Sequence, residues 1–145
     1  MISTLVLRAL GAAGFHVLDS WVYCLRGGLA IMFLFTASAH WGKRRPDLIA
    51  MVPSFVPRAD MMVSLTGALE ILGGLGLLIP ETAKSAASCL ALLLIALFPA
   101  NVRAAREDLK IGGRSATPLP LRTLLQLVFI GALIVAGFPR FFGGL

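Results

Sequence analysis

Hydrophobic and polar residues are segregated into long blocks along this chain. Runs of about 19 to 20 almost wholly apolar residues are separated by short segments that hold most of the charges. A helix of about 20 residues is about 30 Å long, which matches the apolar core of a bilayer. Each run therefore predicts a membrane-spanning helix. The predicted spans are residues 21–40, 61–79, 83–102 and 119–138.

The segment before the first span has a different pattern. Within residues 1–20 the apolar positions recur at helical spacing, and Ser3, Thr4 and Arg8 lie off that stripe. This pattern is typical of an amphipathic helix that lies in the membrane interface. The chain is thus predicted to be an all-α integral membrane four-helix bundle over residues 21–145, preceded by an interfacial segment over residues 1–20.

One acidic residue, Glu70, stands in the middle of the second span. A carboxylate in hydrocarbon costs a few kcal/mol, so this side chain is expected to face the protein interior. The residues one helical turn away are Thr66, Gly67, Gly73 and Gly74. Such a small and polar face allows another helix to approach closely.

Polar residues at the ends of the other spans lie in the same half of the predicted membrane domain. They predict a polar pocket in which Glu70 and His40 are the catalytic candidates, acting as proton carriers. The candidate ligand-binding residues are Thr66, Asn101, Arg122 and Gln126 in this half, and Arg26 near the opposite end of the first span. Structural roles are the alternative for several of them, because a terminal His, Arg or Asn also serves as an interface residue, a snorkelling anchor or a helix cap.

Prolines interrupt the helical pattern at two places. The connector 41–60 contains three prolines around an apolar segment, residues 48–52, which indicates an ordered cap across the membrane face. Pro99 lies inside the third span and has no amide hydrogen, so the carbonyl of Ile95 is expected to lose its helical partner.

Composition and charge agree with a membrane protein. The chain has 145 residues, of which 58% are hydrophobic and 14% charged, and its mean hydropathy is +0.89. Soluble domains rarely have this composition. Nine of the 13 basic residues lie on the side of the connectors 41–60 and 103–118. The positive-inside rule places these connectors in the cytoplasm and both termini outside a bacterial inner membrane. The net charge of +6 then indicates anionic lipid as the contact, not nucleic acid.

The two cysteines carry no recognisable motif. Cys24 and Cys89 form no CxxC pair and no metal-ligand spacing, so no metal site is predicted. Whether they pair with each other is left open.

Several short motifs resemble DoxX-like membrane proteins between about Leu25 and Phe138. The motifs, in order, are Leu25–Ala30 with Phe33, His40 and Trp41, then Met51–Pro53, Leu65–Glu70, Pro80, Phe98–Asn101, and Leu121–Arg122 with Gln126. The resemblance implies a four-helix membrane bundle. The name-giving members are similar to small subunits of thiosulfate:quinone oxidoreductases, and other members are linked to membrane redox and sulfur-stress complexes. It implies no catalytic residues, and this chain lacks a cysteine pair for thiol chemistry.

Taken together, these features favour a redox-associated membrane subunit that binds a quinone or a similar lipid-soluble molecule. Quinone carbonyls need hydrogen-bond donors and quinone reduction needs protons, which His40, Arg122, Gln126 and Glu70 would provide. The alternatives are a membrane isomerase or cyclase that uses Glu70 as acid or base, and a non-catalytic scaffold or small-molecule carrier. The expected partners are the bilayer and the small molecule, and a second copy of the chain or a redox subunit is a further candidate.

Overall fold

A computed structural model describes residues 5–6 and 21–139 of the chain. This part is mostly helical, and four of its helices are long and apolar enough to cross a membrane. The helices are α2 (Trp21–Ser38), α3 (Arg45–Met51), α4 (Ala59–Leu78), α5 (Ala83–Arg106) and α6 (Leu119–Gly137). The strands are β1 (Lys110–Ile111) and β2 (Arg114–Ser115). The four long helices correspond to the four predicted spans, whereas the predicted interfacial helix lies outside the described residues except for Leu5 and Val6.

The helix ends differ from the prediction in ways that the local sequence explains. Helix α5 continues four residues beyond the predicted end, to Arg106, and basic residues in its last turn suit the negative end of the helix dipole. Helix α2 ends at Ser38, so His40 lies in the following turn, where its backbone N–H donates to the carbonyl of Ala37 at 3.0 Å.

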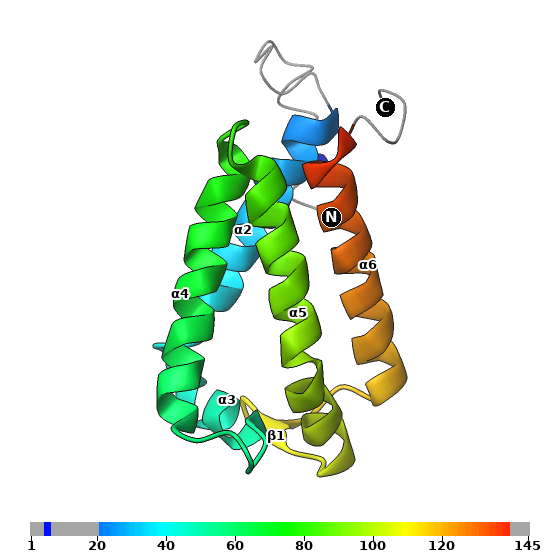
Figure 1. Cartoon of the computed structure of the whole chain (residues 1–145). Helices are drawn as coiled ribbons and strands as arrows, with labels where there is room; N and C mark the ends of the chain where they lie inside the picture. The colour runs from blue at the N-terminus through cyan, green and yellow to red at the C-terminus, as the bar shows by residue number, and fades with distance from the viewer. Residues whose placement is uncertain (1–4, 7–20, 140–145) are drawn as a thin grey trace.

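The bundle consists of two helix pairs, α2 with α4 and α5 with α6 (Figure 1). Glycines let the helices of each pair approach. A Cβ added to Gly74 on α4 would lie 3.5 Å from the Cβ of Phe33 on α2. A Cβ added to Gly137 on α6 would lie 2.7 Å from the Cβ of Ala87 on α5. Small residues thus set the spacing within each pair, as is common in membrane bundles.

The two pairs are packed together at the end that holds the turn between α4 and α5. A Cβ added to Gly73 would lie 2.5 Å from the side chain of Leu90, and one added to Gly76 would lie 2.9 Å from the Cβ of Ala86. The apolar core lies at this level, and its fully buried members include Phe33, Leu77, Leu90 and Leu133. Towards the opposite end, larger residues replace the glycines and the pairs diverge (Figure 1).

A cap covers the end where the helix pairs diverge. We use "cap" for residues 43–56, which include α3. The hairpin β1–β2 lies beside the cap and turns through Gly112 and Gly113, whose φ angles of 61° and 79° suit glycine. The Asp47 Oδ2 atom accepts a hydrogen bond of 2.8 Å from the backbone N–H of Gly112. The cap and the hairpin are therefore held together.

Arg45 fixes the start of the cap to the turn that follows α2 and to α4. Its Nη1 donates to the carbonyl of His40 at 2.8 Å. Its Nη2 lies 3.0 Å from the carbonyl of Asp60 and 3.0 Å from Ser64 Oγ, both on α4. At the other end of α3, Arg103 of α5 donates to the carbonyl of Val52. The cap is thus anchored to both helix pairs, which agrees with the ordered cap that the prolines predict.

Candidate functional site

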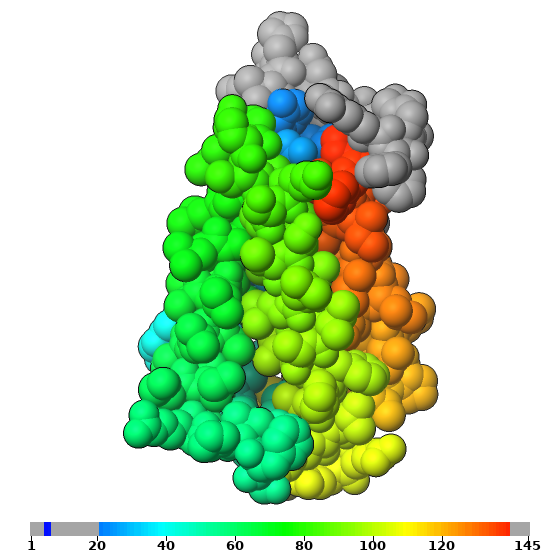
Figure 2. Space-filling view, viewed as in Figure 1, coloured from blue at the N-terminus to red at the C-terminus, as the bar shows by residue number. Residues whose placement is uncertain are grey.

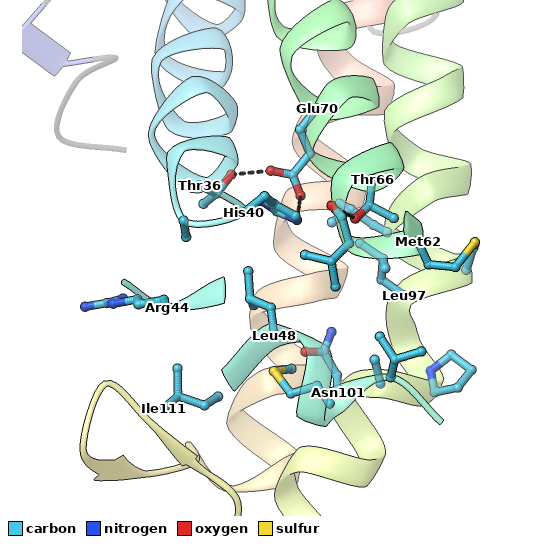
Figure 3. Close-up of a pocket in the computed structure, with 18 of the residues that line it drawn as sticks. Thr36, His40, Arg44, Leu48, Met62, Thr66, Glu70, Leu97, Asn101 and Ile111 are labelled. Atoms are coloured by element: carbon cyan, nitrogen blue, oxygen red, sulfur yellow. Dashed lines mark hydrogen bonds and ion pairs between the residues drawn. The ribbon is translucent and has the colours of Figure 1, made fainter. Parts of the chain in front are cut away.

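A cavity of about 710 Å³ lies between the two helix pairs, directly against the cap (Figure 3). Its walls come from α2, α3, α4, α5, β1 and the turns around α3, whereas no residue of α6, which is described throughout, lines it. Most lining side chains are apolar, including Leu48, Met51, Met62, Val63, Leu94 and Leu97. The volume and the apolar lining are typical of sites for small molecules.

Glu70 lies on the wall of this cavity, with only 6% of its surface exposed. Its Oε2 atom is 2.9 Å from the hydroxyl oxygen of Thr36 on α2 (Figure 3). The same hydroxyl lies 3.0 Å from the carbonyl oxygen of Phe33. A threonine hydroxyl has a single hydrogen, so it donates either to the carboxylate or to the carbonyl. When the hydroxyl donates to the carbonyl of Phe33, a protonated Glu70 can donate to the hydroxyl oxygen. Thr36 and Glu70 therefore form a hydrogen bond in both protonation states of the carboxyl group.

His40 is the second buried titratable group of the site, with 7% of its surface exposed. Its Nε2 atom lies 3.9 Å from Glu70 Oε1, and its Nδ1 atom lies 3.3 Å from the carbonyl oxygen of Ala37. A carbonyl only accepts hydrogen bonds, so this contact favours a hydrogen on Nδ1. The nitrogen that faces Glu70 is then the one that gains or loses a proton. His40 fits here because residue 67 of the adjacent helix is glycine.

The structure brings Asn101, Arg122 and Gln126 together, but only Asn101 lines the cavity. Arg122 Nη1 donates to Asn101 Oδ1 at 2.9 Å, and Asn101 Nδ2 lies 3.5 Å from Gln126 Oε1. Gln126 Nε2 donates to the carbonyl of Leu94 at 3.0 Å, next to the Ile95 carbonyl that Pro99 leaves without its helical partner. Arg122 and Gln126 therefore connect α6 to α5 and hold the second helix pair together behind the cavity wall.

The remaining candidates have separate positions. Thr66 lines the cavity, and its hydroxyl donates to the carbonyl of Val63 at 3.0 Å. Arg26 lies at the opposite end of the bundle, where its Nε donates to the carbonyl of Ala136 at 2.9 Å and its guanidinium lies 5.7 Å from the ring centre of Tyr23. The structure thus places Arg26 between α2 and α6 and does not bring it to the cavity.

The cysteines and the acidic residues do not form a metal site in the described part of the chain. Cys24 is buried and Cys89 is exposed, and no disulfide joins them. No group of three or more His, Cys, Asp or Glu side chains within residues 5–6 and 21–139 is arranged to hold a metal ion.

Thr36 is a site residue that the sequence reasoning missed. It lies four residues before His40, a spacing that puts both residues on one face of the predicted helix 21–40. That spacing is the feature of the sequence that indicates Thr36 as a neighbour of His40 in the site. Lys43 and Arg44 at the start of the cap also line the cavity.

Comparisons with known proteins give one match. No curated protein and no solved structure matches the sequence. A family described as a domain of unknown function, DUF8561, matches residues 29–136. This range contains every residue that lines the cavity, as well as Arg122 and Gln126. The match covers well over half of the chain, which therefore belongs to the DUF8561 family.

Proposed function

We propose that this protein is an integral membrane protein that binds a lipid-soluble small molecule in the cavity between its helix pairs. The observation that carries the proposal is the buried pair of Glu70 and His40, 3.9 Å apart, on the wall of a largely apolar cavity of about 710 Å³. An apolar chamber with two adjacent proton-carrying groups suits a ligand that is mostly hydrocarbon and has a carbonyl or hydroxyl group.

The outer surface supports insertion in a membrane. Large apolar side chains point outward along the long helices, and Leu72, Leu92 and Leu127 are each more than 60% exposed. Apolar surface of this extent is unusual on soluble monomers and is expected where lipid covers it. Basic residues gather at the cap end, namely Lys43, Arg44, Arg45, Arg58, Arg103, Arg106, Lys110 and Arg114. This charge bias, read with the positive-inside rule, supports our proposal that the cap faces the cytoplasm and that the protein lies in a bacterial cytoplasmic membrane.

A quinone is the ligand class that the site suits best. Its carbonyl oxygens accept hydrogen bonds, and a proton on His40 Nε2 or on Glu70 provides the donor. Reduction of a quinone to a quinol takes two electrons and two protons. Glu70 and His40 would pass the protons, and a redox partner subunit would supply the electrons. The resemblance of the chain to DoxX-like proteins supports such a redox-associated role.

Binding without redox chemistry is the second candidate. The same pair would serve a carrier or an isomerase in which Glu70 acts as acid or base, because proton transfer needs no further group on the protein. Turnover separates these functions: a carrier binds its ligand unchanged, whereas an isomerase returns an altered product.

Binding of a quinone to the purified protein tests the proposal. The protein would be placed in lipid nanodiscs and titrated with a short-tailed ubiquinone by calorimetry. We expect Glu70→Gln and His40→Gln each to weaken binding about tenfold, which corresponds to about 1.4 kcal/mol and is the usual scale of one lost hydrogen bond. Glu107→Gln, which changes an exposed carboxylate on the cap side, is the matched control and should leave binding unchanged. Absence of binding to the wild type, or equal binding by all variants, would overturn the proposal.

A further inference from the structure

We infer that the ligand is a lipid with one polar head and a long hydrocarbon tail, and that the tail leaves the cavity sideways between α4 and α5. The inference rests on the proposed function and adds a ligand class and a path to it. The head would reach Glu70 and His40. The tail would lie in the opening between the helices and continue into the surrounding lipid.

The route from the cavity to water is covered by the cap. Arg45 ties the start of the cap to the turn that follows α2 and to α4 through three hydrogen bonds. Asp47 ties it to the hairpin, and Arg103 ties its end to α5. Entry from the aqueous side would require several of these bonds to break together, whereas no hydrogen bond or ion pair among the described residues joins α4 to α5 beside the cavity.

The α4–α5 interface changes along its length in a way that opens it beside the cavity. Gly73 and Gly76 of α4 contact Leu90 and Ala86 of α5 so closely that an added Cβ would come within 3.0 Å of each. The same helical faces continue to Met62 on α4 and to Leu94 and Leu97 on α5, which line the cavity. Side chains of this size hold the helices apart. Figure 2 shows the surface hollowed between α4 and α5 at this level, just above the segment that joins α3 to α4.

The chemistry of this opening suits hydrocarbon. Met62 is 36% exposed, and Leu97, which lines the cavity from α5, is apolar and half-buried. The edge of the cavity near the end of α2 differs, because Lys43 and Arg44 line it. A hydrocarbon tail avoids charged groups, so the α4–α5 opening is the path that the lining favours.

The distances along α4 fit a head and tail of this kind. Glu70 and Met62 are eight residues apart, which is about 12 Å along a helix. A ring that contacts Glu70 therefore leaves room for the first part of a tail before the opening is reached. Figure 3 shows Met62 and Leu97 on the same side of the cavity, below Glu70.

A bulky residue in the opening provides the first test. Leu97→Trp should weaken binding of a ubiquinone with a four-isoprene tail at least tenfold and leave binding of the tail-less head group within twofold. Leu92→Trp is the matched control, since Leu92 lies on the same helix, is 65% exposed and does not line the cavity. It should change neither affinity. Equal weakening of both ligands by Leu97→Trp, or no weakening of either, would overturn the inferred path.

A labelling experiment on the unaltered chain decides the path even if the tryptophan variant fails to fold. A quinone with a photoreactive group at the tail end would be bound in nanodiscs and irradiated. We expect labels within residues 59–66 or 94–101. Labels confined to the cap, or to α2 and α6, would overturn the path while leaving the proposed binding site intact. A tail-less head group that fails to bind the wild type would instead overturn the proposed function and the inference with it.

Discussion

Gly67 on α4 lies directly against His40, without space for a side chain between them. A Cβ added to residue 67 would be 2.7 Å from the Cβ of His40 and 2.9 Å from the ring of Trp41. Contacts this short do not persist, so any larger residue would move the turn that carries His40. Glu70 lies three residues further along the same helix. Gly67 therefore sets the position of the histidine relative to the carboxyl group.

The first prediction concerns this contact. Gly67→Ala should destabilise the protein by about 1–3 kcal/mol, the usual cost of overpacking, and should also weaken ligand binding because His40 is displaced from Glu70. The midpoint of thermal unfolding in detergent and the quinone titration measure the two effects.

Gly131→Ala is the matched control for Gly67→Ala. Gly131 also lies in a long helix, but an added Cβ there would meet nothing within 4 Å. The substitution should be neutral or should stabilise α6 by up to about 1 kcal/mol, because alanine favours helix over glycine. If both alanine variants unfold at the same temperature, the close contact at Gly67 does not constrain His40.

The second prediction separates the two roles of Glu70. Glu70→Gln retains the shape of the side chain and a partner for Thr36, so its unfolding temperature should stay close to that of the wild type. Glu70→Ala leaves a void and removes one of the two hydrogen-bond partners of the Thr36 hydroxyl, the other being the carbonyl of Phe33, which should cost about 1–3 kcal/mol. Unfolding monitored by circular dichroism compares the two. Equal losses of stability would show that the charge or the proton of Glu70, and not its size, supports the fold.

The third prediction is the orientation in the membrane. Single cysteines would be placed at Ser54 in the cap region and at Ser115 in β2, both exposed, in a background without Cys24 and Cys89. With the cap in the cytoplasm, an impermeant thiol reagent added to intact cells should label neither site until the cells are opened. Labelling of both sites in intact cells would reverse the orientation.

The fourth prediction concerns the anchoring of the cap. Arg45→Ala removes three hydrogen bonds that hold the cap to α4 and to the turn after α2, and it should speed amide exchange across residues 48–56 by tenfold or more. Arg44→Ala, which changes an exposed neighbour, should leave the exchange rates close to those of the wild type. Exchange in the wild type as fast as in an unstructured peptide would show that the cap is not ordered.

The hydrophobic pattern was sufficient to predict the long helices, because runs of about 20 apolar residues have few other stable conformations. The exact ends of the helices were harder to predict from the sequence. Helix α5 extends through a segment that carries Arg103 and Arg106, and charge alone does not show whether such a segment is the last turns of a helix or a loop. The hairpin after α5 was also not predicted, since its strands are only two residues each and their pattern is too short to read.

The candidate site could be predicted in part. Depth along the spans indicated that Glu70, His40 and Asn101 belong to one half of the bundle, and the structure places all three on one cavity. The depth of a residue along its span does not show in which direction around the helix axis its side chain points. For this reason the sequence did not show that Arg122 and Gln126, which lie at a suitable depth, point to α5 behind the cavity wall. For the same reason it did not identify Thr36, which contacts Glu70 directly.

The position of Glu70 within α4 has an electrical consequence. Counted from the cap end, it lies 11 residues into a helix of 20, slightly more than halfway. With α4 inserted as proposed, a proton that reaches Glu70 from the cytoplasm crosses about half of the membrane potential. One elementary charge across 100 mV corresponds to about 2.3 kcal/mol, so half of the field contributes about 1 kcal/mol, or roughly a fivefold change in proton occupancy. An energised membrane would thus bias the protonation of this carboxyl group without any change in the pH on either side.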